Sequence, residues 1–260
     1  MKHPVLVLFT MLLAAGTSHS DEGTRLVYRD PSGRLSLTVS QAMEVRASQT
    51  IEAARELSFG LTLAPTTITI DEAKASAEAH GMNQRLNTRH LTGKTIALSI
   101  ADGGRRLAAA HGDDALTIDL GPMVEGGGYS LAGLLADILP VLPDKPVARG
   151  DSWTTETPLR SIEGWAWATG KLASRHRVTA IEKQGASTLV TVESEATSSL
   201  APIEGQRAYR GELKRKVRWT FDATAGRLAT LTLEQDTDGL SDLMEQDSKI
   251  LQHTKVVLAP

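Results

Sequence analysis

The stretch that decides the fold is the alternating run LSLTVSQAMEV, which occupies residues 35–45. Apolar side chains stand at Leu35, Leu37 and Val39, with polar ones between them, and the pattern continues through Met43 and Val45. A period of two is typical of a strand with one buried face and one solvent-facing face, as in antiparallel sheets. This run therefore predicts a long antiparallel strand.

The same alternation recurs along the chain, at residues 51–63, 96–100 and 116–120. Turn-forming sequences lie between the runs: DPSG at 30–33, DGG at 102–104, DATAG at 222–226 and DG at 238–239. Together these signals predict a mainly β protein.

One amphipathic helix is expected at residues 130–139, because apolar residues recur there at helical spacing. Its apolar stripe contains Leu131, Leu134, Leu135, Ile138 and Leu139. Three glycines precede it, and two prolines follow it, as expected at the ends of a helix. Residues 71–81 have helix-forming composition, but their alanines alternate, which favours a strand with small residues on one face.

The chain also shows an apparent internal repeat. Residues 94–109 and 216–232 each contain a strand, an Asp- and Gly-containing turn, an Arg-Leu pair and a second strand. We therefore expect a first β-rich half at residues 21–125, a helix and proline linker at 126–146, and a second β-rich half at 147–260.

Residues 1–20 are typical of a secretory signal peptide, with a basic start, a short apolar run and small residues at Ser18 and Ser20. We expect cleavage before Asp21 and export to the periplasm or the extracellular space. The chain has no cysteine, which excludes disulfides, thiolate chemistry and a lipid anchor on cysteine. Its net charge of −3 argues against nucleic acid as a partner, and no later segment is predicted to cross the membrane.

Two motifs hint at chemistry, and neither predicts a site. The GDSW sequence at 150–153 resembles the nucleophile block of GDSL-type esterases, but nothing nominates a base or an orienting acid for Ser152. We interpret it as a turn leading into a strand, and predict no catalytic residue. The DTDGLSD sequence at 236–242 resembles part of a calcium loop, but it lacks the third alternating acid and the bidentate Glu. No two histidines of the exported chain are spaced as metal ligands, so no metal and no cofactor are expected.

Basic residues crowd into residues 214–218, where Lys214, Lys216 and Arg218 share one face of a predicted strand. They are suited either to anionic head groups or to cross-strand pairing with Glu234 and Asp236, and we favour pairing.

Trp165 and Trp167 share a strand face in a chain with only 4% aromatic residues. They are expected either to line an apolar cavity or to fill the core.

The segment LPDKPVARGDSW at 142–153 resembles the Pro-Val-x-x-Gly-Asp-Ser-Trp segment of a family of exported bacterial proteins of unknown function. The expected architecture is also similar to that of the periplasmic lipoprotein carriers of the LolA/LolB type, in which a curved half-barrel sheet holds acyl chains under covering helices. The second resemblance implies a long, curved antiparallel sheet of half-barrel type, here with two similar halves joined by one amphipathic helix.

These expectations favour a non-catalytic exported protein that binds a lipid or another hydrophobic small molecule. The ligand would lie on the concave face of the sheet, against Leu131, Leu134, Leu135 and Ile138 of the helix, with Trp165 and Trp167 as further candidates. The alternative is a structural or protein-interaction module of the cell envelope with a filled core. The sequence nominates no protein partner and gives no credible constellation for a hydrolase.

Overall fold

The computed structural model describes residues 23–46, 50–79, 81–109, 117–119, 128–159, 168–202, 209–241 and 248–260. The predicted signal peptide and the two tryptophans Trp165 and Trp167 lie outside these ranges. The strands are β1 (Gly33–Arg46), β2 (Thr50–Ala64), β3 (Thr67–Ala79), β4 (Met82–Arg85), β5 (Thr95–Ala101), β6 (Arg106–Ala109), β7 (Thr117–Asp119), β8 (Gly128–Ser130), β9 (Ser152–Leu159), β10 (Ala168–Gln184), β11 (Ser187–Pro202), β12 (Tyr209–Asp222), β13 (Arg227–Ser241) and β14 (Ser248–Ala259). The helix α1 spans Leu131–Ile138, and two 3-10 turns lie at η1 (Arg89–Leu91) and η2 (Asp102–Gly104).

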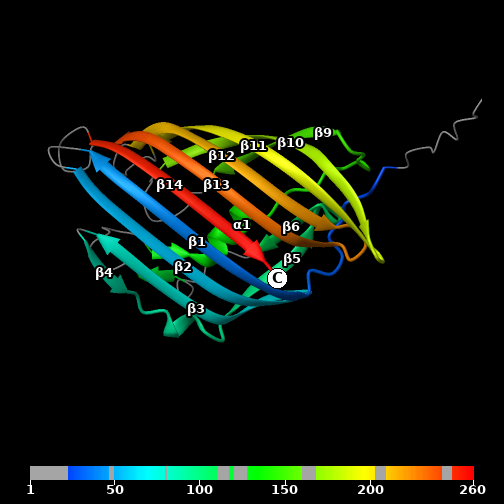
Figure 1. Cartoon of the computed structure of the whole chain (residues 1–260), viewed down its shortest axis with the longest axis horizontal. Helices are drawn as coiled ribbons and strands as arrows, with labels where there is room; N and C mark the ends of the chain where they lie inside the picture. Colours follow the sequence, from blue (N-terminus) through cyan, green and yellow to red (C-terminus); the bar gives the residue numbers. More distant parts are fainter. Residues whose placement is uncertain are drawn as a thin grey trace, which may run out of the picture.

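One antiparallel sheet of 12 strands dominates the structure (Figure 1). Its strand order is β6-β5-β3-β2-β1-β14-β13-β12-β11-β10-β9, and β4 pairs with β3 beside this path. Strands β1 and β14 pair along eleven residues and join the two parts of the chain into one sheet. The short strands β7 and β8 form a separate pair. The prediction of a mainly β, antiparallel protein is confirmed.

One finer expectation about the sheet is not met. The sheet is neither closed nor strongly curled, so it does not have the half-barrel form that the lipoprotein-carrier resemblance implied. The two parts of the chain follow one another in the same direction across the sheet. Read from one edge, the first part runs backward from β6 to β1, and the second part then runs backward from β14 to β9. The hairpins at residues 94–109 and 216–232 therefore occupy different places, one at an edge and the other inside the sheet.

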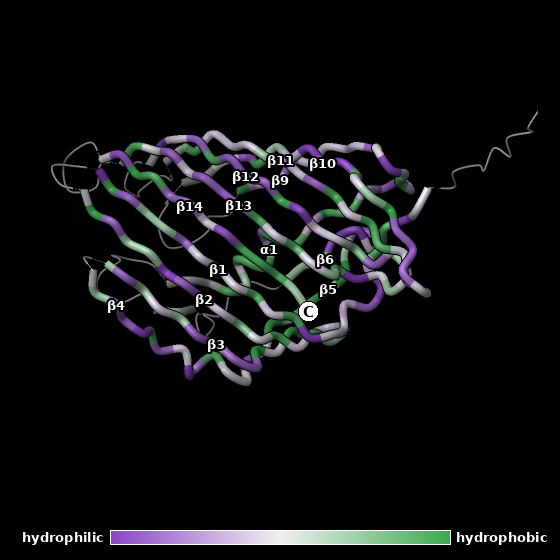
Figure 2. Tube along the Cα trace, viewed as in Figure 1, coloured by the Kyte–Doolittle hydropathy of each residue, from purple (hydrophilic) through white to green (hydrophobic). Residues whose placement is uncertain are grey.

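The two faces of the sheet differ in polarity, and Figure 2 shows hydrophobic and hydrophilic residues alternating along the strands. The covered face, as we name it, carries Leu37, Leu57 and Leu233 and packs against α1 in one apolar core. The opposite, outer face carries exposed residues such as Lys216 and Glu234. Apolar burial on one face only explains why the strands alternate.

The helix α1 completes the core on the covered face. Leu131, Leu134, Leu135 and Ile138 are all buried, and so are Ala132 and Gly133. The predicted helix is therefore confirmed, but it is packed nearly all around. Among the described residues, no helix has the length and apolar composition that spanning a membrane requires.

Residues 24–29 form a segment that contacts both the residues after α1 and strand β12. Thr24 forms a two-way backbone bridge with Val147, and the Tyr28 hydroxyl donates to the Pro140 carbonyl at 3.2 Å. The Tyr28 ring meets the edge of Phe221 with centroids 5.3 Å apart. This segment thus connects Pro140, after α1, to Phe221 of β12.

Residues 71–79 extend strand β3, as the alternating alanines predicted. A bulge places Asp71 and Glu72 opposite Gly60 of β2. The extra residue moves the covered side from even positions such as Ile70, which is buried, to odd ones: Ala73, which is half-buried, and Ala75, which is buried. The alanines therefore face the covered side, where helix-forming composition is overridden by sheet packing.

Candidate functional site

A row of polar residues crosses the covered face. The row contains the following directly opposed residues of eight neighbouring strands: Arg55, Gln41, Thr254, Gln235, Arg215, Ala196, Ser174 and Thr155. Ala196 is its only apolar member. The polar row lies between the main core and a smaller apolar cluster. This cluster includes Ala196 of the row together with Met43, Val45, Leu172, Leu200, Leu213 and Ile250.

Side-chain hydrogen bonds connect much of the polar row. Gln41 Nε2 donates to Thr254 Oγ1 at 3.0 Å, and Arg55 Nε donates to Gln41 Oε1. Farther along, Arg215 donates to Gln235 Oε1 from both Nε, at 3.0 Å, and Nη2, at 2.8 Å. Such bonds are required because buried polar groups without partners are costly. The polar residues of the row therefore satisfy much of one another's hydrogen bonding on the covered face.

A pocket of about 160 Å³ opens where the polar row meets α1. Its roof is the end of α1 and the segment that follows, from Ala136 to Val141, and its floor is the covered face of β9 to β12. The floor residues are Thr155, Thr157, Pro158, Leu159, Leu172, Ser174, His176, Ser194, Ala196, Arg215, Val217 and Trp219, and Arg106 lies at the side. Apolar walls with a few converging polar groups are typical of small-molecule sites.

The histidine in the pocket floor is held by two hydroxyls. His176 Nδ1 lies 2.7 Å from Ser194 Oγ, and His176 Nε2 lies 2.8 Å from Thr155 Oγ1. Trp219 Nε1 donates to the same Ser194 oxygen at 3.3 Å, and the Trp153 ring stacks on the imidazole at 4.9 Å between centroids. Burial lowers the pKa of the His176 imidazole to about 4. The ring is therefore neutral near pH 7.

The contact between Ser194 and His176 has the length of a nucleophile–base pair. In a hydrolytic triad the second ring nitrogen would meet a carboxylate that orients the ring and stabilises its cation. Here that nitrogen meets the Thr155 hydroxyl, and burial disfavours the cation. The arrangement fits a neutral hydrogen-bond network better than a catalytic one.

The GDSW sequence builds a turn, as predicted. Gly150 has φ +93°, a left-handed conformation that glycine adopts without strain. Asp151 Oδ2 accepts a hydrogen bond from the Ala148 amide at 2.8 Å, and the chain then enters β9. Ser152 is exposed, whereas His176 is buried on the covered face. The two side chains lie on opposite faces, so the esterase-like reading of Ser152 finds no partner in His176.

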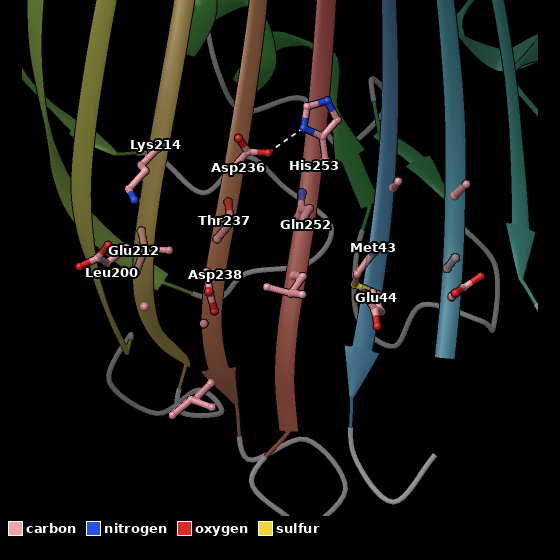
Figure 3. A pocket seen from close by; sticks show the side chains of 18 of the residues that line it. Met43, Glu44, Leu200, Glu212, Lys214, Asp236, Thr237, Asp238, Gln252 and His253 are labelled. Carbon is pink, nitrogen blue, oxygen red and sulfur yellow. Dashed lines mark hydrogen bonds and ion pairs between the residues drawn. The ribbon is translucent and has the colours of Figure 1, made fainter. Parts of the chain in front are cut away.

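A second, larger hollow of about 1530 Å³ lies at the end of the strands nearest residues 46 and 209 (Figure 3). Its lining alternates along the strands, so Asp236 and Asp238 of the outer face appear together with Thr237 of the covered face. Figure 3 shows Asp236 bonded to His253, with Nδ1 to Oδ1 at 2.7 Å. Lining from both faces means that this volume is open space around the strand ends rather than one enclosed pocket.

The calcium-loop resemblance also falls in this region. Asp236 and Asp238 lie in β13, and Gly239 is part of the same extended strand rather than of a loop. Asp242 lies outside the described residues. Across the described ranges, no group of three or more metal-binding side chains comes together.

The exposed basic residues of β12 lie opposite acidic residues of the neighbouring strands. Lys216 lies opposite Glu195 on one side and Glu234 on the other, and Glu234 in turn lies opposite Lys255. Lys214 lies opposite Asp236. The register therefore brings these cations next to acidic residues, as the cross-strand interpretation expects.

The structure separates the candidate ligand-binding residues of the helix. Ile138 lines the pocket, whereas Leu131, Leu134 and Leu135 are packed in the main core. Trp165 and Trp167 lie outside the described residues.

Sequence reasoning missed the polar row and His176. A signal was present, because Gln41 and Arg55 interrupt otherwise apolar alternation at positions that face the core. The chain's likeness to known proteins offers no further guide: no protein-family model matches the sequence, and no curated protein matches it significantly.

Proposed function

We propose that this chain is an exported, non-catalytic binding protein that holds a small hydrophobic or amphipathic molecule between α1 and strands β9 to β12. The observation that carries the proposal is the pocket of about 160 Å³ on the covered face. A dry cavity of roughly this volume accepts a molecule about the size of benzene. Export rests on the signal-peptide pattern of residues 1–20.

The walls of the pocket support an amphipathic occupant. Leu172, Ala196 and Val217 offer apolar surface, and Ser174 adds a hydroxyl among them. Within the described residues, the Ser174 side chain makes no hydrogen bond. A ligand with an apolar body and one polar group would cover the apolar side chains and form a hydrogen bond with the Ser174 hydroxyl.

The pocket volume also limits the ligand. Most apolar residues of α1 are embedded in the core, so the helix acts as a fixed roof rather than as a lid. An acyl chain of lipid length would have to displace the segment after α1. The lipid expected from the carrier resemblance is therefore less favoured than a smaller molecule.

The second candidate function, a structural or protein-interaction module, is favoured by the filled core. Buried apolar residues occupy most of the covered face, including Phe59, Trp219 and Phe221. In that case the pocket would bind nothing, and the polar row would only fix the sheet.

A titration with a neutral probe separates the two. We expect 1-hexanol to shift the NMR signals of the Trp219 indole N–H and of residues near Ala196, with saturation. Ala196→Phe should abolish saturation, because the ring occupies the pocket. The control Thr197→Phe adds the same ring to the exposed face of the same strand and should bind like wild type. Absence of saturable shifts in the wild-type protein would favour the interaction module.

A further inference from the structure

The pocket floor contains a buried cation. Arg215 is 4% exposed and lines the pocket. Burial lowers the pKa of its guanidinium to about 10, so the group is charged near pH 7. A buried charge is costly unless it is compensated. The hydrogen-bond partners and charges around this cation therefore indicate which kind of ligand the pocket would bind.

The compensation of Arg215 is incomplete in hydrogen bonds. A guanidinium has five N–H donors, and Arg215 uses three: two on Gln235 Oε1 and one, from Nη1, on the Asp137 carbonyl at 3.4 Å. One N–H bond on Nη1 and one on Nη2 have no acceptor within the described part of the chain. These two donors belong to adjacent nitrogens, the pair that a carboxylate binds.

The charges around the pocket favour an anion. Among the described residues that line it, Arg215 and Arg106 are cationic, and Asp137 is acidic. The Asp137 carboxylate raises the pKa of Arg215, opposing the effect of burial. The imidazole of His176 is neutral, as described above. The described lining therefore carries a net positive charge, which a monoanionic ligand would neutralise.

The remaining walls define the rest of the ligand. Leu172 and Ala196 lie on one side of Arg215, on β10 and β11, and Ile138 lies above on α1. These side chains give an apolar space next to the charged group. Given a volume of about 160 Å³, this space suits a body of roughly six carbons, by comparison with benzene-sized cavities.

We propose, resting on the binding function above, that the ligand is a small monocarboxylate with an apolar body, whose two oxygens accept hydrogen bonds from Arg215 Nη1 and Nη2. The apolar body lies against Leu172, Ala196 and Ile138.

The test compares three probes of equal length on the wild-type protein: hexanoate, hexanamide and 1-hexanol, by NMR titration at pH 7.5. Hexanoate is expected to bind about tenfold to a hundredfold more tightly than the two neutral probes, because hydrogen bonds to a charged pair are stronger than neutral ones. Equal affinities for all three would overturn the carboxylate proposal while leaving the binding function supported. Failure of all three to bind would overturn both.

Two variants locate the effect. Arg215→Lys keeps the charge but loses the paired N–H geometry, and should weaken hexanoate while leaving 1-hexanol unchanged. Lys216→Gln removes a cation from the next residue, on the outer face, and should leave both affinities unchanged. If Lys216→Gln weakens hexanoate as much as Arg215→Lys does, attraction to the whole surface explains binding and the proposal is wrong. Because the probe comparison uses the wild-type protein, it stands even if Arg215→Lys folds poorly.

Discussion

Replacement of His176 by glutamine tests the buried network of the pocket floor through pH. In the folded protein burial lowers the pKa of His176 from 6.5 to about 4. The unfolded chain therefore binds the proton more tightly, and stability is lost as the pH falls from 6.5 toward 4. His176→Gln retains a hydrogen-bonding side chain but cannot titrate, so it lacks this loss.

The magnitude follows from the size of the pKa shift. Each pKa unit corresponds to about 1.4 kcal/mol, so the full effect is about 3 kcal/mol. Linkage gives a loss of about 1.3 kcal/mol between pH 7.5 and 5.5, and of about 2.5 kcal/mol by pH 4.5. These losses apply to the wild-type protein relative to His176→Gln.

The assay is urea unfolding of both proteins at pH 7.5, 5.5 and 4.5, monitored by circular dichroism. The quantity compared is the change in unfolding free energy with pH, so any constant effect of the substitution cancels. If both proteins lose the same stability between pH 7.5 and 4.5, His176 is not held neutral in the fold, and the description of the pocket floor is wrong.

Three further predictions concern the frame around the site. Trp219→Ala should lower the free energy of unfolding by about 3–5 kcal/mol, because Trp219 is 1% exposed; a loss below about 1 kcal/mol in chemical denaturation would contradict its place in the core. Gly226→Ala should cost more than Gly185→Ala, although both have left-handed φ, because a Cβ at Gly226 would lie 2.7 Å from Arg29 Cβ whereas the one at Gly185 meets nothing within 4 Å; equal thermal shifts would refute this. Asp151→Ala should cost about 1 kcal/mol through loss of its bond to the Ala148 amide, and an unchanged melting temperature would show that the turn does not depend on it.

The sequence alone was sufficient for the helix and for several of the strands, because both depend on local periodicity. Alternation identified β1, β2 and even the alanine-rich end of β3, and helical spacing identified α1. In each case the repeating residues face the covered side, where most of them are buried and the rest are partly buried.

Long-range pairing was beyond this reasoning. Strands β1 and β14 are about 200 residues apart in the chain, yet they form the centre of the sheet. Alternation shows which side of a strand is buried, but every strand of the sheet alternates, so the pattern does not select its neighbours. The expectation of two similar halves rests on such local patterns and stays a prediction.

The pocket could not be predicted from the sequence for a related reason, because it depends on which strands pair and in which register. Ser194, His176 and Trp153 are brought side by side only by the register of β9, β10 and β11. Arg215 stood out in the sequence as one of several basic residues, although the parity of its strand separates it from Lys214 and Lys216. Applying the alternation to polar residues would have placed Arg215 on the covered face.

The central claim is that the pocket between α1 and strands β9 to β12 binds a small carboxylate. The most direct measurement is a crystal structure of the protein grown with hexanoate. The account predicts density beneath Ile138, with the carboxylate within hydrogen-bond distance of Arg215 Nη1 and Nη2. An empty pocket, with hexanoate absent or bound only on the outer face, would contradict it.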